Sequence, residues 1–271
     1  MKKLLFTLSV CAMCAVVSPL PSQANWVDDL SNISNALGEY NRKAEAKRQE
    51  LIEICNRGVD AYNDKDYDTA VNCWQSASEQ GHAASTYYLG ICYLYGTGVQ
   101  ANEQEAFKLF RSAAKGDWPA AQAKLGECYL NGIGTQKKHS EAFKWLSKAA
   151  KQESANAYGN LGLCYYKGYG TKINYQQAAK YLSLAAKNDD KQAFLTLGLL
   201  YLDANNPDYS QQEGLKWLDK AATSGNYEAK LLLAKHCLRY NKGEYTAVKA
   251  INLYNESINT TKNNIQKSEE E

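Results

Sequence analysis

The sequence predicts an all-α fold, an α-solenoid of about six antiparallel helix pairs preceded by an N-terminal amphipathic helix. The main observation is a repeat with a period of 36 residues, the interval from Gly90 to Gly126. Leu-Gly pairs and tyrosines recur at this interval, at Leu89-Gly90, Leu125-Gly126, Leu161-Gly162 and Leu197-Gly198, and at Tyr93, Tyr129, Tyr165 and Tyr201. A period in the mid-thirties is typical of helix pairs that stack into an elongated array.

Each unit divides into two helices, here named helix A and helix B. In the unit from 121 to 150, small and apolar residues follow helical spacing over 121–131 and again over 142–150. The second stripe consists of Ala142, Trp145, Leu146, Ala149 and Ala150. Because small residues let two helices approach closely, we expect Gly126 and Ala142 to meet where the helices cross.

Glycine pairs separate helix A from helix B in three units, at Gly96 and Gly98, Gly132 and Gly134, and Gly168 and Gly170. The first glycine suits the left-handed residue that ends a helix, and the second permits the turn. Residues 203–207 replace the pair in the fourth unit, so that turn must be built differently. Capping residues precede most B helices, at Asp66, Asn102, Asn174, Ser210 and Thr246.

These residues resemble the Sel1-like repeat, a relative of the tetratricopeptide repeat. The pattern A-x-x-x-L-G-x-x-Y-x-x-G-x-G is matched almost throughout by the units that start near Ser85, Ala121 and Ala157. The resemblance implies a tetratricopeptide-like unit at 49–82, four Sel1-like repeats at 83–226 and a degenerate repeat or cap at 227–262. Residues 263–271 end in three glutamates and are expected to form a flexible acidic tail.

The start of the chain is typical of a secretory signal peptide. Lys2 and Lys3 precede an apolar run, and small residues end residues 1–24. We expect cleavage near Ala24-Asn25, a mature form without a membrane span, and a periplasmic or secreted location. Removal of the segment takes away two of the 31 basic residues and leaves 29 against 29 acidic ones. This balance argues against nucleic acid as a partner.

Residues 25–48 are predicted to form an amphipathic helix. Trp26, Leu30, Ile33, Leu37, Tyr40 and Ala44 follow spacings of three and four. One interpretation is a cap that folds back over the first repeat, because the end of a solenoid needs a cover. The other is a helix for docking or for a dimer through residues 26–48.

Six cysteines follow the predicted signal peptide. Cys92, Cys128 and Cys164 hold the same place in successive units and are expected to be free and buried, although the sequence does not establish the redox state of these three or of Cys237. Cys55 and Cys73 would face each other if Gly58 crosses Ala70, which predicts one disulfide. The spacing of cysteines and histidines does not match a metal site.

Catalytic motifs are lacking. The three histidines, His82, His139 and His236, fall in different units. The G-x-G pairs recur with the repeat and are therefore turns and not phosphate-binding loops. The sequence predicts a protein that is not an enzyme and that needs no cofactor.

Binding is the remaining expectation. In related solenoids the A helices line a concave groove that holds a partner protein. If this chain follows its relatives, the positions two before, one after and five after each repeat glycine face the groove. They are Tyr88, Ile91, Tyr95, Lys124, Glu127, Asn131, Asn160, Leu163, Lys167, Thr196, Leu199 and Asp203.

Three functions fit such a groove. The resemblance favours a scaffold or adaptor that binds an envelope, secreted or toxin protein. The first alternative is a dedicated inhibitor, such as an immunity protein against a secreted phospholipase or a regulator of a cell-wall enzyme. The second is binding or hydrolysis of a cell-wall or β-lactam ligand. The sequence names no partner.

Overall fold

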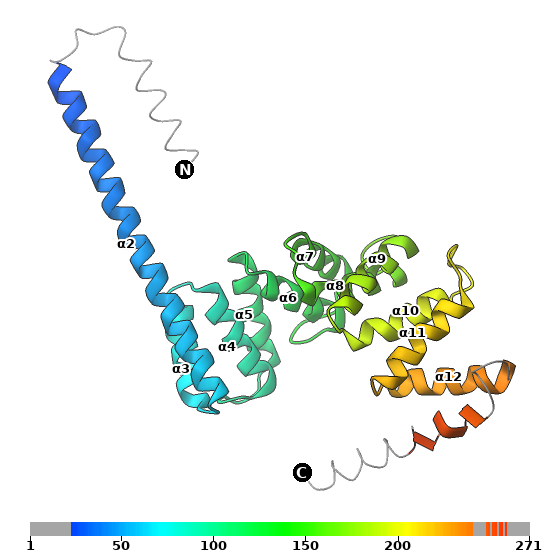
Figure 1. Ribbon diagram of the computed structural model, residues 1–271. Helices are drawn as coiled ribbons and strands as arrows, with labels where there is room; N and C mark the ends of the chain where they lie inside the picture. The colour runs from blue at the N-terminus through cyan, green and yellow to red at the C-terminus, as the bar shows by residue number, and fades with distance from the viewer. Residues whose placement is uncertain (1–22, 241–247, 250, 254, 257, 259–271) are drawn as a thin grey trace. The chain divides into compact units, whose positions relative to one another are not determined.

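The computed structural model describes residues 23–240, 248, 249, 251–253, 255, 256 and 258. These residues are helical or lie in turns, without a strand, which confirms the predicted all-α class (Figure 1). The helices are α2 (Gln23–Asn63), α3 (Tyr67–Glu79), α4 (Ala83–Tyr95), α5 (Glu103–Lys115), α6 (Pro119–Asn131), α7 (His139–Lys151), α8 (Ala155–Lys167), α9 (Tyr175–Lys187), α10 (Lys191–Tyr201), α11 (Gln211–Thr223) and α12 (Tyr227–Tyr240). The chain forms two compact units, residues 1–54 and residues 55–271.

The second unit is a stack of helix pairs. Each helix A packs most closely on its own helix B, in the pairs α4–α5, α6–α7, α8–α9 and α10–α11. Each helix B then packs on the next helix A along the chain. The A helices of neighbouring pairs also touch one another, α4 with α6, α6 with α8 and α8 with α10. They therefore form a continuous wall.

The repeat glycines lie opposite large side chains. A Cβ atom on Gly126 would lie 2.6 Å from Cγ of Leu146, and the same relation joins Gly90 to Phe110 and Gly162 to Leu182. The side chain nearest to Gly126 is therefore Leu146, one helical turn after the predicted Ala142. The glycine makes room for this large residue of helix B. In the fourth pair the two small residues also lie close together, because a Cβ atom on Gly198 would lie 3.1 Å from the carbonyl oxygen of Gly214.

The glycine pairs end the A helices as expected. Gly96, Gly132 and Gly168 are left-handed C-caps with φ of 71°, 84° and 73°. The second glycines do more than permit a turn. A Cβ atom on Gly98, Gly134 or Gly170 would collide with the backbone at the start of the preceding helix B, at Tyr67, Glu103 or His139. These glycines therefore allow neighbouring pairs to pack backbone against backbone.

The turn after α10 is built by side-chain amides and a carboxylate. Asp203 accepts a hydrogen bond from the backbone N–H of Asn205 at 2.9 Å. Asn206 is buried and donates from Nδ2 to the carbonyl oxygen of Leu200 at 2.9 Å. Polar side chains that bond to nearby backbone groups thus replace the glycine pair in this unit.

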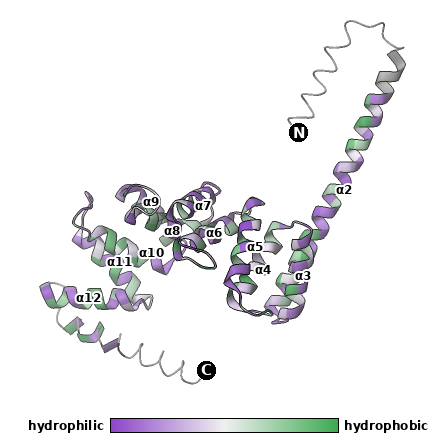
Figure 2. Ribbon diagram, turned by 180° about the vertical axis from the view of Figure 1, so that it is seen from behind, coloured by the Kyte–Doolittle hydropathy of each residue, from purple (hydrophilic) through white to green (hydrophobic). Residues whose placement is uncertain are grey.

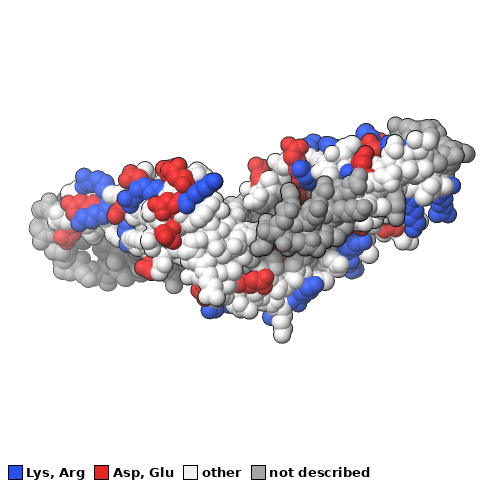
Figure 3. Space-filling view, turned by 90° about the horizontal axis from the view of Figure 1, so that it is seen from below, with Lys and Arg blue, Asp and Glu red and all other residues white. Residues whose placement is uncertain are grey.

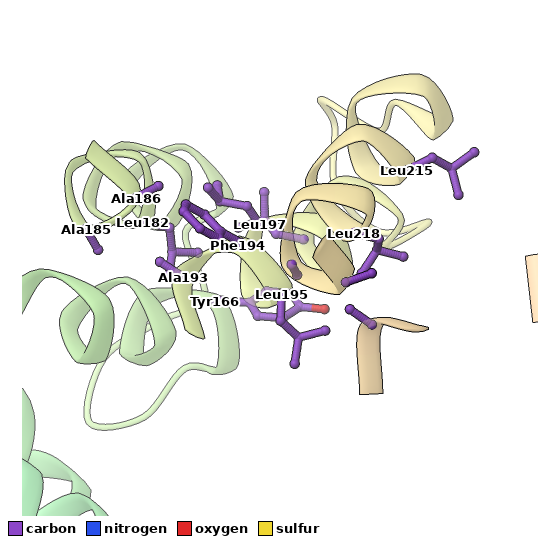
Figure 4. Packing of buried hydrophobic residues seen from close by; sticks show 14 of the residues in the cluster. Tyr166, Leu182, Ala185, Ala186, Ala193, Phe194, Leu195, Leu197, Leu215 and Leu218 are labelled. Atoms are coloured by element: carbon purple, nitrogen blue, oxygen red, sulfur yellow. The ribbon is translucent and has the colours of Figure 1, made fainter. Parts of the chain in front are cut away.

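Apolar side chains of several helices form the core. Figure 4 shows Leu182 of α9, Phe194 and Leu197 of α10 and Leu218 of α11 gathered where these helices meet. Leu182, Leu197 and Leu218 are almost fully buried. Leu253 packs against Ala234 and Cys237 of α12. Described residues before and after 241–247 in the predicted segment 227–262 therefore contact each other.

The repeat cysteines lie in this core. Cys92, Cys128 and Cys164 are free and buried, as expected, and so is Cys237. Burial raises the pKa of Cys92 to about 11 and the pKa values of Cys128 and Cys164 to about 12. These thiols therefore behave as small apolar side chains and not as nucleophiles.

Cys55 and Cys73 are both free thiols in the structure. The expected pairing relied on a crossing of Gly58 with Ala70, whereas Gly58 lies against the ring of Trp74. Cys55 lies against Trp74 as well, whose Nε1 donates to the carbonyl oxygen of Cys55 at 3.2 Å. The Cys55 thiol instead contacts Ser85, and burial raises its pKa.

The first unit contains the N-terminal part of α2. Residues 25–48 belong to one uninterrupted helix that continues to Asn63, and residues 29–50 are exposed. The predicted amphipathic helix is thus part of a longer helix, and the cap and docking interpretations both stay predictions.

Both chain ends carry predictions that lie outside the described residues, namely most of the signal peptide at 1–24 and the acidic tail at 263–271. Within the described part of the chain, no helix is both long and apolar enough to cross a bilayer.

Candidate functional site

A hollow of about 360 Å³ lies on the wall formed by the A helices. Its lining comes from α4, α6, α8 and the turn between α9 and α10, and consists of Tyr87, Ala120, Ala123, Lys124, Glu127, Ala155, Asn156, Asn188 and Asp190. Three of these residues are alanines, whose short side chains leave space between the longer side chains at the edges. The hollow spans three successive units, so only the stacked array forms it.

An ion pair of α6 lies in the hollow. Nζ of Lys124 donates to Oε2 of Glu127 at 2.8 Å, and the two side chains are only 19% and 30% exposed. Burial lowers the pKa of Lys124, but the hydrogen bond and negative charge of Glu127 outweigh burial and raise the pKa above its usual value. Lys124 therefore stays charged, and a ligand would meet an oriented pair of opposite charges.

Tyrosines of α4 border this pair. Tyr87 is half-buried between Tyr88 and Phe110, at ring-centroid distances of 5.5 and 5.9 Å. Burial raises the pKa of the Tyr87 hydroxyl, and the charge of nearby Lys124 partly opposes this rise. Tyr95 also interacts with the Lys124 charge and is 67% exposed. The α4 edge therefore offers aromatic surface beside a cation.

Amides and a carboxylate form the opposite edge. Asp190 caps α10 by accepting from the backbone N–H of Gln192 at 3.0 Å. Its side chain lies against Gly159 of α8, where any side chain would collide with it. Asn156 and Asn188 complete this edge. The cap holds the carboxylate in place, so this side of the hollow is polar and negative.

The structure brings together only part of the predicted groove set. Lys124 and Glu127 line the hollow, and Tyr95 lies near them. Tyr88 instead stacks on Trp74 of α3, with ring centroids 5.1 Å apart. Tyr88 therefore packs against α3, and its neighbour Tyr87 lines the hollow instead.

The remaining predicted residues lie outside the lining of the hollow. Ile91 packs against the cluster around Phe110. Lys167 lies over the ring of Tyr166, with Nζ 4.1 Å from the ring centroid. Asn131 is exposed, Asn160 is half-buried, and Asp203 builds the turn after α10.

Sequence reasoning missed Tyr87, Asn156, Asn188 and Asp190. A helical signal for the first two exists, because positions six and three before the repeat glycine share a face with the position one after it. In α6 these are Ala120, Ala123 and Glu127, and all three line the hollow. No periodic signal marks Asn188 and Asp190, since they lie in a turn.

The histidines and the residues of metal-binding type are dispersed over the described part of the chain. No cluster of three or more His, Cys, Asp or Glu among them could hold a metal ion. The histidines lie apart and have structural contacts, such as His82 Nδ1 with Ser85 Oγ at 2.8 Å and His139 against the Tyr169 ring. On the face shown in Figure 3, acidic and basic side chains are interspersed, unlike the basic stripe of a nucleic-acid interface.

Five segments of the chain match the Sel1 repeat family model, namely residues 62–82, 83–117, 119–154, 155–190 and 197–226. The chain is similar to a solved Sel1 repeat protein from Oxalobacter formigenes, with 32% identity, coverage of 70% of this chain and 76% of that one, and a TM-score of 0.60. It is also similar to a protective antigen of uropathogenic Escherichia coli strains that displays an SLR fold, with 25% identity, coverage of 79% and 47%, and a TM-score of 0.63.

One curated relative matches a shorter part. An exopolysaccharide production negative regulator of Rhizobium meliloti is 40% identical over 58 residues, which make up 21% of this chain and 22% of the relative. The match thus spans about a fifth of that protein. It supports the repeat and not a shared role.

Proposed function

We propose that this chain, which belongs to the Sel1 repeat family, binds a short segment of a partner protein. The proposed site is the hollow of the A helices. Sel1 repeats suggest a protein–protein interaction scaffold, and the hollow is the site that we propose for this role. We further propose that the protein acts in the periplasm or outside the cell, after cleavage near Ala24-Asn25.

One observation carries the proposal: a partly buried, oriented ion pair and a tyrosine share a hollow that three stacked units build. Tyrosine supplies a large rigid contact area together with a hydroxyl, and such residues dominate binding energies at interfaces. Asn156 and Asn188 can each donate and accept hydrogen bonds, which suits the amide groups of a peptide backbone. The hollow therefore fits an extended segment better than a single charged metabolite.

The test is site-specific photo-crosslinking in the mature protein, expressed with its own signal peptide. A photoreactive residue replaces Asn156 in the hollow or, as the control, Lys144, whose side chain is 71% exposed on helix B of the same array. We expect a discrete partner band from Asn156 and none at that mass from Lys144. Equal capture from both positions, or capture from Lys144 alone, would contradict the proposed site.

The captured partner also separates the scaffold from the alternatives. Several envelope proteins would support a scaffold. A single enzyme that loses its activity on binding would identify an inhibitor instead.

A further inference from the structure

The N-terminal part of α2 carries a coiled-coil pattern. Trp26, Leu30, Ile33, Leu37, Tyr40 and Ala44 alternate at intervals of four and three residues, which are the core positions of a heptad repeat. Lys47 takes the next core position and ends the stripe. Figure 2 shows apolar residues recurring along α2 among polar ones. Such a 3.5-residue period favours two helices that wind around each other.

This stripe is exposed. Leu30, Ile33 and Leu37 are 45%, 49% and 43% exposed, and Tyr40 is 70% exposed. Apolar side chains that stand together on one face of a helix mark a contact surface, whereas scattered ones do not. A second helix laid along this face would bury them.

The segment also needs a partner to be a stable helix. Poor helix formers are frequent in it, namely Ser31, Asn32, Ser34, Asn35, Gly38 and Asn41. Residues 29–50 are exposed, so packing among the described residues does not offset this low propensity. Because helices in proteins owe most of their stability to packing of an apolar face, the missing contacts must come from another helix.

We propose that this helix is the same segment of a second copy, running antiparallel, with Ile33 of each chain against Leu37 of the other. This register also places Leu30 against Tyr40 and Trp26 against Ala44. The contact is isologous, because every pair occurs twice about a two-fold axis. The proposal does not depend on the partner that the hollow binds.

Charges beside the stripe select the antiparallel orientation. In the heptad, Asp29 and Lys43 occupy the same flanking position, and such positions face each other between antiparallel helices. The register above brings Asp29 of each chain beside Lys43 of the other, which forms two attractive pairs. A parallel dimer would instead place Lys43 beside Arg48 of the other chain and repel it.

The first experiment is sedimentation equilibrium of the mature full-length protein over a series of concentrations. We expect a dimer that dissociates on dilution, and a monomer for Ile33→Asp with Leu37→Asp. The matched control, Ser31→Asp with Asn35→Asp, adds the same charge on the opposite face of the helix and should remain dimeric. An unmodified protein that is monomeric throughout, or equal loss of the dimer in both double variants, would overturn the proposal.

The second experiment tests orientation and leaves the apolar stripe unchanged. Lys43→Asp should weaken the dimer about tenfold, since it places like charges beside Asp29 at both ends. Asp29→Lys combined with Lys43→Asp should restore the original affinity, because the attractive pairs return with opposite signs. A dimer strengthened by Lys43→Asp would indicate parallel helices and overturn the antiparallel register.

Discussion

The two faces of each helix A differ in how strictly they repeat. On the face toward helix B, glycine, leucine and cysteine return every 36 residues, and each glycine meets a large residue such as Phe110, Leu146 or Leu182. On the face toward the hollow, the same structural position holds Tyr87, then Ala123, and then Gly159. The repeating face builds the array, and the varying face gives each unit its own surface.

Binding specificity in such an array is expected on the varying face. Packing between helices A and B tolerates little variation, because protein interiors are close-packed and even one added methylene group disturbs the packing. The hollow has no such restriction on its side chains. Departures from the repeat are therefore the better guide to binding residues.

The largest expected effect comes from breaking the packed face. Gly126→Leu should destabilise the protein by about 3 kcal/mol, because a side chain there overlaps Leu146 in a fully packed core. Asn131→Leu, an exposed position five residues along the same helix, should change stability by less than about 0.5 kcal/mol. Chemical denaturation of both variants measures the difference, and similar midpoints would refute the crossing at Leu146.

A smaller effect separates strain from contact between units. Gly134→Ala should cost about 2 kcal/mol, because φ is 62° and the new Cβ would meet the backbone of Glu103. Gly81→Ala provides the control, since its φ is 85° and no atom lies within 4 Å of the added Cβ. It should cost about 1 kcal/mol from backbone strain alone. Equal thermal shifts for the two variants would show that the contact with Glu103 contributes nothing.

The smallest of these effects concerns the buried thiols. The pKa of Cys164 is raised to about 12 by burial, while an unfolded thiol titrates near about 8.5. Its stabilising contribution is complete below the unfolded pKa. It falls as the pH rises toward 12, because only the unfolded state loses the proton.

Between pH 9 and pH 10 this loss should amount to about 1 kcal/mol. Cys164→Ala should lower stability at neutral pH but remove that part of the alkaline slope. Urea unfolding at the two pH values gives the slopes for both proteins. Identical slopes would mean that the thiol ionises equally in the folded and unfolded states.

The fold and part of the site could be predicted from the sequence. The helix pairs, the left-handed glycine caps and the buried thiols follow from periodicity, because equivalent residues have equivalent surroundings in a stacked array. Register within a pair does not follow from periodicity, since Gly126 can cross at Ala142 or one turn later at Leu146 with the same pattern. The expected Cys55–Cys73 disulfide relied on the same kind of assumed crossing.

The hollow was harder to predict because it belongs to no single unit. Lys124 and Glu127 could be assigned from their places on helix A. Tyr87 and Tyr88 are adjacent in sequence and both pack against core clusters, and only Tyr87 also lines the hollow, since Tyr88 stacks on Trp74. Asp190 reaches the hollow through a cap on α10, which a pattern along α8 cannot reveal.

The varying face of the A helices is the proposed binding site for the partner. It is tested most directly by calorimetric titration with the partner that crosslinking identifies. The double variant Tyr87→Ala with Asn156→Ala lacks one side chain from each edge of the hollow. The control is Lys108→Ala with Lys144→Ala, two B-helix side chains that are 70% and 71% exposed. For protein that remains folded by circular dichroism, we predict at least about 2 kcal/mol weaker binding by the hollow variant and no change for the control. Unchanged affinity of the hollow variant, or an equal loss in the control, would contradict the claim.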